Sequence, residues 1–292
     1  MNACNSTTIE NGTELGKNYS AYALVFGSVM TLGLPLNAVS LWILVRSHGL
    51  KSPSAVFMVN LAISDLLLVL SLPTRVYFYA TCTWPLSQVA CIFVTMLFRN
   101  NIRSSSIFIT FICVDRLLAV VYPLRSRHLR TSSNASKAAA LVWLFVLAVN
   151  IPESVIFSRF LKNNNISLCF EFQSGPESPL NYLLPVLVFI LLAVNVVCTT
   201  LVSRALRSHL TDSARVSNKV NVMLIFVMNL MMFIVFFLPL SLAVLIESWR
   251  PAFTSLICLA SVNCCLDPLL YYFSFDGFWR RKEDVDSSHA ME

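Results

Sequence analysis

Five polar residues in apolar segments have the types and spacing of one buried, oxygen-rich cavity. Asp65 lies in the middle of NLAISDLLLVLSLP, which is otherwise almost entirely apolar. Asn101 and Ser105 are four residues apart, so they share one face of a helix, and Asn263 and Asp267 have the same spacing. Two carboxylates in one cavity repel, so either one is protonated or a cation lies between them. Oxygen ligands suit a hard cation such as sodium, and a water-filled hydrogen-bond network without an ion fits the spacing equally well.

Three arginines also lie in apolar segments, where an ionisable side chain is costly and normally has a partner. Arg75 stands alone, and Arg99 and Arg103 are four residues apart on one stripe. The acidic residues within reach are Glu153 and Glu247. One interpretation is an internal ion pair of Arg99 or Arg103 with Glu153. The other is a pocket for an anionic headgroup, in particular phosphate, because guanidinium planes bind it bidentately.

Such a pocket needs a basic rim and an apolar body. Arg159, Lys162 and Arg250 are placed to steer an anion inward. Aromatic side chains near the arginines could line the apolar part, although each alone is more often ordinary core. They are Tyr77, Tyr79, Phe98, Phe108 and Phe157.

The elements that position these residues are membrane-spanning helices. Of the 292 residues, 57% are hydrophobic and 12% are charged, whereas an average soluble domain has about 25% charged residues. A run of about 20 apolar residues crosses a bilayer as a helix, and continuous runs without a period of two favour helices over a barrel. Seven runs cover approximately 21–45, 55–80, 89–122, 138–158, 180–206, 217–246 and 252–274.

Basic residues beside the spans predict the orientation. With the N-terminus outside, the outer side holds only Lys17, Arg159, Lys162 and Arg250, and the other basic residues beside the spans lie inside, as the positive-inside rule requires. Glycosylation sequons agree at Asn5, Asn11, Asn18 and Asn165, and the one at Asn134 is interpreted as a chance match. Residues 1–20 lack the pattern of a cleavable signal peptide, so we expect the first span to insert uncleaved. The net charge of +6 then adds attraction to anionic membrane lipids.

Motifs in order along the chain resemble the rhodopsin-like (class A) G-protein-coupled receptors. They are NLAISD in the second span, DRLLAVVYPL at the end of the third, Trp143 in the fourth, FFLP in the sixth and DPLLYYF at the end of the seventh. The resemblance implies an all-α membrane protein with a seven-helix bundle over 21–274. An extracellular, glycosylated segment (1–20) precedes the bundle, and a short amphipathic helix with a cytoplasmic tail (275–292) follows it.

The resemblance also assigns roles to the polar residues. The family's sodium pocket maps onto Asp65, Asn101, Ser105, Asn263 and Asp267, with an allosteric sodium ion favouring the resting state. At the cytoplasmic end, the adjacent carboxylate of Asp115 holds Arg116 until activation releases it to the G protein. The alternative for Arg116 is a side chain that snorkels at the membrane edge. The other switch residues that the resemblance implies are Leu124, Phe237, Pro239, Pro268 and Tyr271.

Two pairs of cysteines fall on the predicted outer side. The resemblance implies a disulfide between Cys91 and Cys169, and position alone allows a weaker second pair, Cys4 and Cys82, on the same oxidising side. Most of the other cysteines lie in spans, where small buried hydrophobic residues are expected. The chain departs from the family pattern at Leu117 and Phe237, which replace aromatic residues, and at Asp267, which replaces the usual Asn.

Three longer stretches look most like lysophosphatidic acid receptors of the purinergic-related branch: GLPLNAVSLWILVRS, SLPTRVYFYATCTWP and YYFSFDGF. This resemblance implies a plasma-membrane receptor for a lysophospholipid, with Arg75 on the phosphate and heterotrimeric G proteins as partners. A nucleotide receptor is the alternative, because a nucleotide also presents phosphate. A transporter or channel would be expected to show repeats or half-helices, and an enzyme a His-containing cluster within the spans. The sequence has neither, and neither a nucleic-acid partner nor an organic cofactor is expected.

Overall fold

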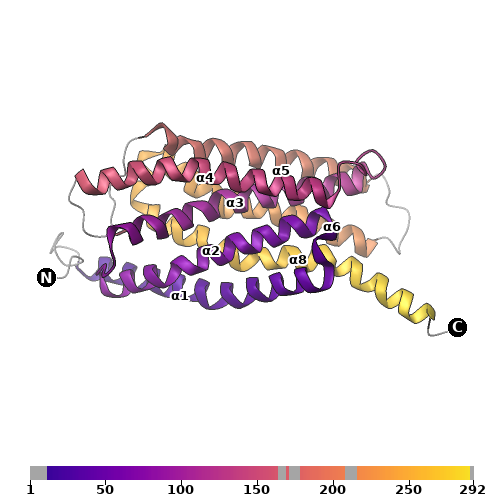
Figure 1. Cartoon of the computed structure of the whole chain (residues 1–292), viewed down its shortest axis with the longest axis horizontal. Coiled ribbons are helices and arrows are strands. Elements are labelled where there is room, and N and C mark those ends of the chain that lie inside the picture. The colour runs from indigo at the N-terminus through magenta and orange to yellow at the C-terminus, as the bar shows by residue number, and fades with distance from the viewer. Residues whose placement is uncertain (1–11, 164–168, 171–177, 208–215, 290–292) are drawn as a thin grey trace.

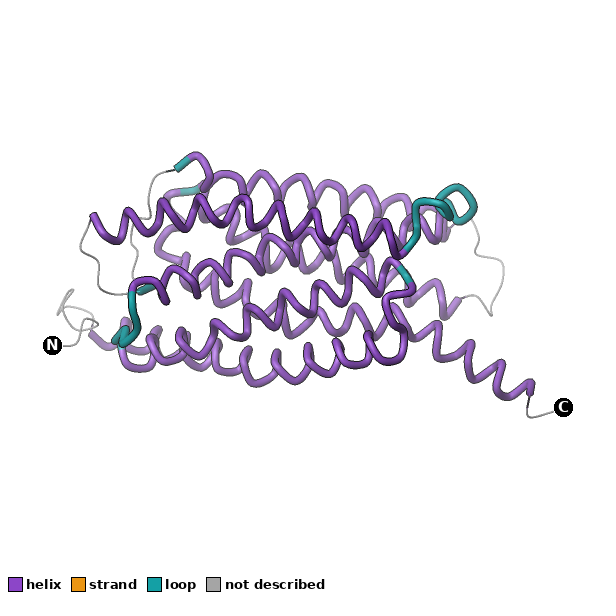
Figure 2. Tube along the Cα trace, in the orientation of Figure 1, coloured by secondary structure: helices purple, strands orange, loops and turns teal. Residues whose placement is uncertain are grey.

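The structure is a computed structural model of helices joined by short connections. It describes residues 12–163, 169–170, 178–207 and 216–289, without the side chains of 12–18, 47–49, 207, 216–221, 250 and 272–289. Within those ranges every regular element is a helix (Figure 2). Seven of the helical segments are long and apolar enough to cross a membrane. The predicted all-α, seven-span class is therefore confirmed, and the chain is a multi-pass membrane protein.

The helices alternate in direction along one axis, so the bundle has two ends (Figure 1). We call the end where α1 begins the N-side and the end where α8 ends the C-side. The main helices are α1 (Gly12–Ile43), α2 (Pro53–Thr81), α3 (Gln88–Val121), α4 (Ser132–Asn163), α5 (Leu183–Arg207), α6 (Val216–Met232), α7 (Leu238–Leu245) and α8 (Phe253–His289). Short π- or 3₁₀-helices connect or interrupt them: η2 (Leu44–His48), η3 (Gly49–Lys51), η4 (Pro179–Tyr182), η6 (Phe233–Phe237) and η7 (Glu247–Ala252).

Helices α2 and α3 form the centre of the bundle, and most of their side chains are buried. Both begin at a serine whose hydroxyl accepts a backbone N–H three residues later, Ser52 from Ala55 and Ser87 from Ala90. These caps satisfy helix-end donors that would otherwise lack a partner. The central pair therefore carries the buried polar residues that the sequence singles out.

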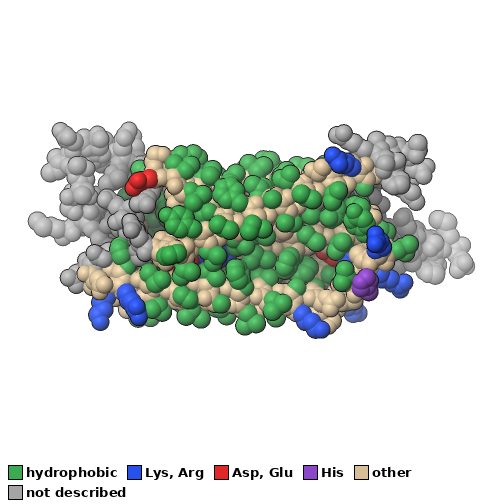
Figure 3. Space-filling model, turned by 90° about the horizontal axis from the view of Figure 1, so that it is seen from above, with side chains coloured by type: hydrophobic (Ala, Val, Ile, Leu, Met, Phe, Trp, Pro, Cys, Tyr) green, Lys and Arg blue, Asp and Glu red, His purple; other side chains and the backbone are tan. Residues whose placement is uncertain are grey.

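The outside of the bundle suits a bilayer. On the face shown in Figure 3, hydrophobic side chains cover the middle of the rod, and Lys and Arg lie near its two ends. Leucine and valine side chains on α1 and α5 are exposed, among them Leu24, Leu32 and Val197. In water such a band would be unfavourable, whereas in lipid it is the expected surface.

The sixth span is built from three pieces. Helix α6 ends at Met232, the five residues of η6 follow in π-helical geometry, and α7 continues to Leu245. The N–H of Leu238 donates to the carbonyl of Phe233, five residues earlier. Pro239 has no N–H and its ring cannot fit a regular helix interior, so the wider turn lies just before the proline, as is common for interrupted helices.

Three helices differ in length from the apolar runs. Helix α1 begins at Gly12, before the predicted 21–45 and within the segment predicted to precede the bundle. Helix α4 extends beyond the predicted 138–158 at both ends because the flanking polar residues are compatible with a helix although they are not apolar. The segment predicted as a separate amphipathic helix (275–292) is helical to His289, but its backbone continues α8 without a break. Gly277 alone does not end the helix, since an interior glycine costs only about 1 kcal/mol.

Candidate functional site

A disulfide ties the N-side connection to the central helix. Cys91 in the first turn of α3 is bonded to Cys169, with 5.7 Å between their Cα atoms, so the predicted pair is confirmed. Phe170 follows with a φ of 69°, a left-handed conformation that is uncommon for a bulky residue. Because the neighbouring cysteine is fixed to α3, the ring of Phe170 is held over the interior. Cys82 is also disulfide-bonded, and Cys4, its predicted partner, lies outside the described residues.

Arg75 occupies an aromatic cage near the N-side end of α2. Its guanidinium carbon lies 4.3 Å from the ring centroid of Phe170, 4.8 Å from that of Phe98 and 5.6 Å from that of Phe26. The side chain is 3% exposed, and its Nε has no hydrogen-bond partner. Among the described residues no carboxylate forms an ion pair with it. Within the described part of the chain, the buried positive charge of Arg75 is therefore contacted by aromatic rings and by no acidic group.

Tyr79, one turn further along α2, extends the aromatic surface of the cage. Its ring is stacked on Phe26, with centroids 5.6 Å apart, and also contacts the ring of Phe170. Of the five aromatic residues expected near the arginines, Tyr79 and Phe98 are buried beside Arg75. Phe157 lies against Arg99, and Phe108 packs against Trp143. By contrast, Tyr77 is 46% exposed, so it faces outward and does not line this space.

Arg99 and Arg103 are paired with Glu153 of α4, which is the ion-pair alternative of the sequence analysis. Arg103 Nη2 donates to Glu153 Oε1 at 2.5 Å, and Nη1 donates to Asn150. Arg99 Nη1 is 3.6 Å from Glu153 Oε2, which is longer than a hydrogen bond. The cluster thus crosslinks α3 to α4 on a different face of α3 from the one that meets Arg75.

The remaining predicted ligand and sugar sites lie at the N-side ends of the helices or outside the described residues. Arg159, Lys162 and Glu247 are exposed. The side chains of Arg250 and Asn18 lie outside the described part, as do Asn5, Asn11 and Asn165. Their roles therefore stay predictions.

The predicted acidic cavity comes together between α2, α3 and α8. Asn101 Nδ2 donates to Asp65 Oδ1 at 2.9 Å, to Ser105 Oγ at 3.1 Å and to Ser64 Oγ at 3.2 Å. All four side chains are at most 1% exposed. One amide thus links two hydroxyls and a carboxylate in the buried interior.

Helix α8 supplies the second carboxylate of the cavity. Asn263 Nδ2 donates to Asp267 Oδ2 at 2.9 Å, and the buried carboxyl groups of Asp65 and Asp267 are close enough for their charges to interact. Asp65 Oδ2, Asp267 Oδ1, Asn263 Oδ1 and the hydroxyl of Tyr271 are buried and have no hydrogen-bond partner within the described structure. A set of oxygens without donors matches the ligand preference of a hard cation, so these residues fit a sodium ion.

On the C-side, Asp115 binds a different arginine from the one predicted. Arg130 of the α3–α4 connection donates from Nε to Asp115 Oδ1 at 2.8 Å and from Nη2 to Oδ2 at 3.3 Å. The hydroxyl of Ser54 at the start of α2 donates to the same carboxylate. The expected Asp115–Arg116 pair is therefore wrong for this conformation, because a bidentate fork from the connection occupies both carboxylate oxygens. Arg116 Nε is buried without a hydrogen-bond partner in the described chain.

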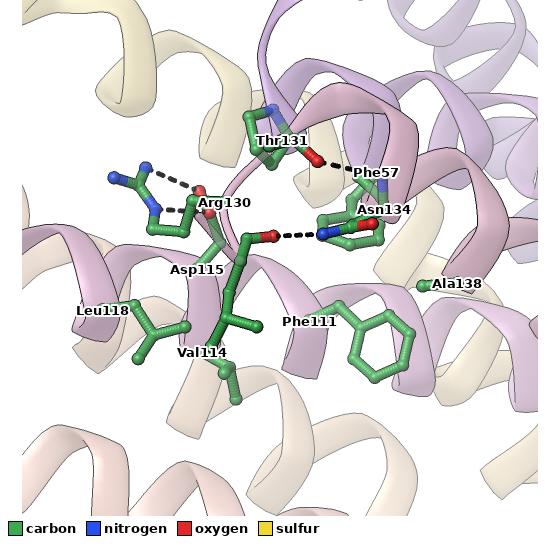
Figure 4. Close-up of a pocket in the computed structure, with 12 residues that line it drawn as sticks. Phe57, Phe111, Val114, Asp115, Leu118, Arg130, Thr131, Asn134 and Ala138 are labelled. Carbon is green, nitrogen blue, oxygen red and sulfur yellow. Dashed lines mark hydrogen bonds and ion pairs between the residues drawn. The ribbon is translucent and has the colours of Figure 1, made fainter. Parts of the chain in front are cut away.

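A cavity of about 220 Å³ opens beside this ion pair (Figure 4). Phe57 of α2, Phe111 and Val114 of α3, and Ala138 of α4 form its apolar wall, with Asp115 and Arg130 at one end. The connection is further held by Asn134, whose side chain donates to the carbonyl of Leu129 at 3.1 Å. Asn134 thus helps to hold the connection against the start of α4.

The other predicted switch residues differ in exposure and in position along the bundle. Leu124 is 87% exposed on the C-side connection, whereas Phe237 is buried beside Phe233. Pro239 follows the π-helical turn, and Pro268 lies inside α8 between the acidic cavity and Tyr271.

Several residues of these sites escaped sequence reasoning. Asn150 is three residues before Glu153, and this polar spacing on one helical face could have identified it. Asn37, whose amide donates to the carbonyl of Cys264 at 2.7 Å, is a lone asparagine in the first span that could have been questioned in the same way. Phe26 and Phe170 of the cage, and Arg130, gave no signal because long-range packing and an irregular connection place them.

Comparison with known proteins agrees with this arrangement. The family described as "7 transmembrane receptor (rhodopsin family)" matches residues 36–271. The chain is 35% identical over 288 residues to lysophosphatidic acid receptor 6 of Gallus gallus, covering 90% of this chain and 93% of the relative. It is 34% identical to lysophosphatidic acid receptor 4 of Homo sapiens over 94% and 79% of the two chains, and 35% identical to lysophosphatidic acid receptor 5 of Bos taurus over 88% and 76%. The chain therefore belongs to the rhodopsin family of seven-transmembrane receptors.

Proposed function

We propose that this protein is a cell-surface receptor for an anionic lysophospholipid of the lysophosphatidic acid class and that it activates heterotrimeric G proteins. Relatives named as lysophosphatidic acid receptors support the ligand class, and the family supports signalling through G proteins. The ligand enters the N-side half of the bundle, and the C-side is read by the G protein.

The caged guanidinium of Arg75 carries this proposal. Burying an unpaired charge costs several kcal/mol, and cation–π contacts return only about 2 kcal/mol when desolvated. A phosphate in contact with Arg75 supplies the missing negative charge through bidentate hydrogen bonds. The rings of Phe98, Phe26 and Phe170 then contact the first apolar part of the lipid.

The N-side faces the outside of the cell in this proposal. The excess of Lys and Arg near the other end of the spans supports that orientation. So does the disulfide of Cys91 and Cys169 at the N-side, since disulfides persist in oxidising compartments.

Within the bundle, Asp65, Asp267 and Asn263 would hold an allosteric sodium ion. When bound, the ion supplies the positive charge that lets both carboxylates stay ionised. Tyr271 and the residues around this site would repack on activation of the receptor. On the C-side, Arg116 and the exposed Leu124 are then the groups that meet the G protein.

The proposal is tested with a panel of lysophospholipids and nucleotides on cells that carry the wild type or Arg75→Ala. We expect the wild type to respond to lysophosphatidic acid and the variant to need at least about 100-fold more ligand, the factor of a charged bidentate contact. Lys137→Ala, an exposed change on α4, is the matched control for expression. A response to nucleotides alone would overturn the lipid assignment, and an unchanged dose response of Arg75→Ala would remove Arg75 from the site.

A further inference from the structure

The cavity of about 220 Å³ on the C-side has no part in the function proposed above (Figure 4). Its lining residues on α2, α3 and α4 lie within the spans, and Phe111, Val114 and Ala138 are only partly buried. On α3 the lining runs from Phe111 to Leu118, about 10 Å along the helix at 1.5 Å per residue. The cavity is therefore open to what surrounds the helices, which along a membrane span is the hydrocarbon of the bilayer.

The wall of this cavity suits hydrocarbon and not water. The rings of Phe57 and Phe111 meet there with centroids 5.2 Å apart, and the side chains of Val114 and Ala138 also line it. A buried water needs two to four polar partners, and these four side chains offer none. An acyl chain would supply the dispersion contacts that an unfilled space lacks. Pockets for drug-sized ligands measure about 300–1,000 Å³, so this cavity takes a segment of one chain.

The polar end of the cavity presents a guanidinium that is not fully used. Arg130 lines this end and is 26% exposed. Asp115 accepts from its Nε and Nη2, and among the described residues Nη1 has no hydrogen-bond partner. An anionic oxygen that approaches from outside can therefore bind Nη1 without displacing Asp115.

The connection at this end of the cavity favours an anion. Residues 122–131 contain Arg125, Arg127 and Arg130 and no acidic residue, and the side chains of Arg125 and Arg127 are exposed. Basic residues beside a membrane surface attract anionic lipid headgroups. An apolar cavity next to a basic connection matches the two parts of an anionic phospholipid, its acyl chain and its charged headgroup.

We propose that this cavity binds one acyl chain of an anionic phospholipid from the surrounding leaflet, with the headgroup phosphate accepting from Nη1 of Arg130. Bilayer chains are as apolar as the wall, so the chain contributes packing rather than transfer from water, and the charge of the headgroup gives the selectivity. The bound lipid joins α2, α3 and α4 to the connection that carries Arg130. The site lies at the opposite end of the bundle from Arg75 and needs no agonist.

Photolabelling of the full chain in nanodiscs of dioleoyl phosphatidylcholine tests the proposal. The probes are phosphatidylglycerol and phosphatidylcholine, each with a photoreactive diazirine in one acyl chain, and mass spectrometry of the peptides locates the label. We expect the phosphatidylglycerol probe to label the peptides that contain Phe57 and Phe111 about 5-fold more than the phosphatidylcholine probe, the factor of one basic contact at a membrane surface. Arg130→Gln should bring the two probes to equal labelling, and Arg130→Lys should keep most of the preference.

A matched pair of variants separates the cavity from the general lipid surface. Ala138→Phe places a ring in the cavity and should lower labelling there by both probes, whereas Ala140→Phe adds the same ring at an exposed position of α4 and should change nothing. Equal labelling of the wild type by the two probes overturns the proposal, and so does a preference that survives Arg130→Gln. Displacement of the phosphatidylglycerol probe by less oleate than unlabelled phosphatidylglycerol also overturns it, because the cavity would then bind a free fatty acid. None of these outcomes depends on a response to lysophosphatidic acid, so failure of this site and failure of the proposed function are distinguishable.

Discussion

Arg75 and Arg103 are the same residue type in neighbouring helices, and both are almost completely buried, yet their surroundings are opposite. Arg103 has the carboxylate of Glu153 and the amide oxygen of Asn150. Arg75 has three ring faces and no acid among the described residues. The difference teaches that burial of a charge alone does not mark a binding site. A charge whose partner is built into the fold holds helices together, and one whose partner is missing is prepared for a ligand.

The largest effect is expected when Arg103 loses its acidic partner. Glu153→Ala leaves Arg103 and Arg99 in the interior without their carboxylate, so we expect a loss of about 3–5 kcal/mol in the free energy of unfolding. Denaturation of the purified protein measures it, with Lys137→Ala as an exposed control on the same helix. A loss below about 1 kcal/mol would show that the carboxylate does not hold this cluster.

The next largest effect is expected at the opposite arrangement, the two carboxylates of Asp65 and Asp267. Sodium should stabilise the wild type by up to about 2.7 kcal/mol at 100 times its dissociation constant, because an ion between Asp65 and Asp267 would offset the repulsion of the two carboxylates. Asp65→Asn removes one of the two charges and should abolish the difference in melting temperature between sodium and choline salts. Equal sodium stabilisation of the variant and the wild type would refute an ion at this position.

The next prediction concerns Arg75, which has no acidic partner among the described residues, and it depends on the sign of a small change in the free energy of unfolding. Arg75→Met removes a charge and strands no partner, so the free energy of unfolding should change by less than about 1 kcal/mol and should rise rather than fall. Arg103→Met is the matched substitution, and it should be clearly destabilising because Glu153 and Asn150 lose their donor. Equal losses in both variants would erase the distinction between the two arginines.

The smallest effect concerns a paired arginine that is partly exposed. Arg130 is 26% exposed and its partner Asp115 is 5% exposed; because Gln keeps an N–H donor and Ser54 still donates to the carboxylate, Arg130→Gln should cost at most about 1 kcal/mol. Arg127→Gln, an exposed change in the same connection, is the control. A loss as large as that of Glu153→Ala would mean that solvent does not screen this ion pair. It would contradict the expected difference between the pair of Arg103 and that of Arg130.

Apolar runs predicted the seven spans because burial in lipid dictates their composition. Spacing of four residues predicted the acidic cavity, since Asn101 with Ser105 and Asn263 with Asp267 depend only on helix geometry. The partner of Asp115 was not predictable in this way. Arg130 lies in an irregular connection, and its distance from Asp115 is set by how that connection folds back, which no periodicity encodes.

The cage around Arg75 shows the same limit. Phe98 was expected near Arg75, but Phe26 comes from α1 and Phe170 from the N-side connection, and only the packed bundle and a disulfide bring them together. For Arg99 and Arg103, the sequence allowed both an ion pair and an anion pocket. It shows that the two arginines share one face of α3, but it does not show which face of α4 is turned toward them. The structure settles the pairing through the position of Glu153.

The π-helical turn at Phe233–Phe237 sets the angular phase of the sixth span. A residue adds about 100° of rotation in an α-helix, so the wider turn offsets everything after it relative to the C-side half. Buried Leu240, Ser241 and Ala243 owe their inward direction to that offset. If the same residues formed a regular α-helix, every later residue would be rotated by about 100°, and this side of α7 would turn toward the acyl chains.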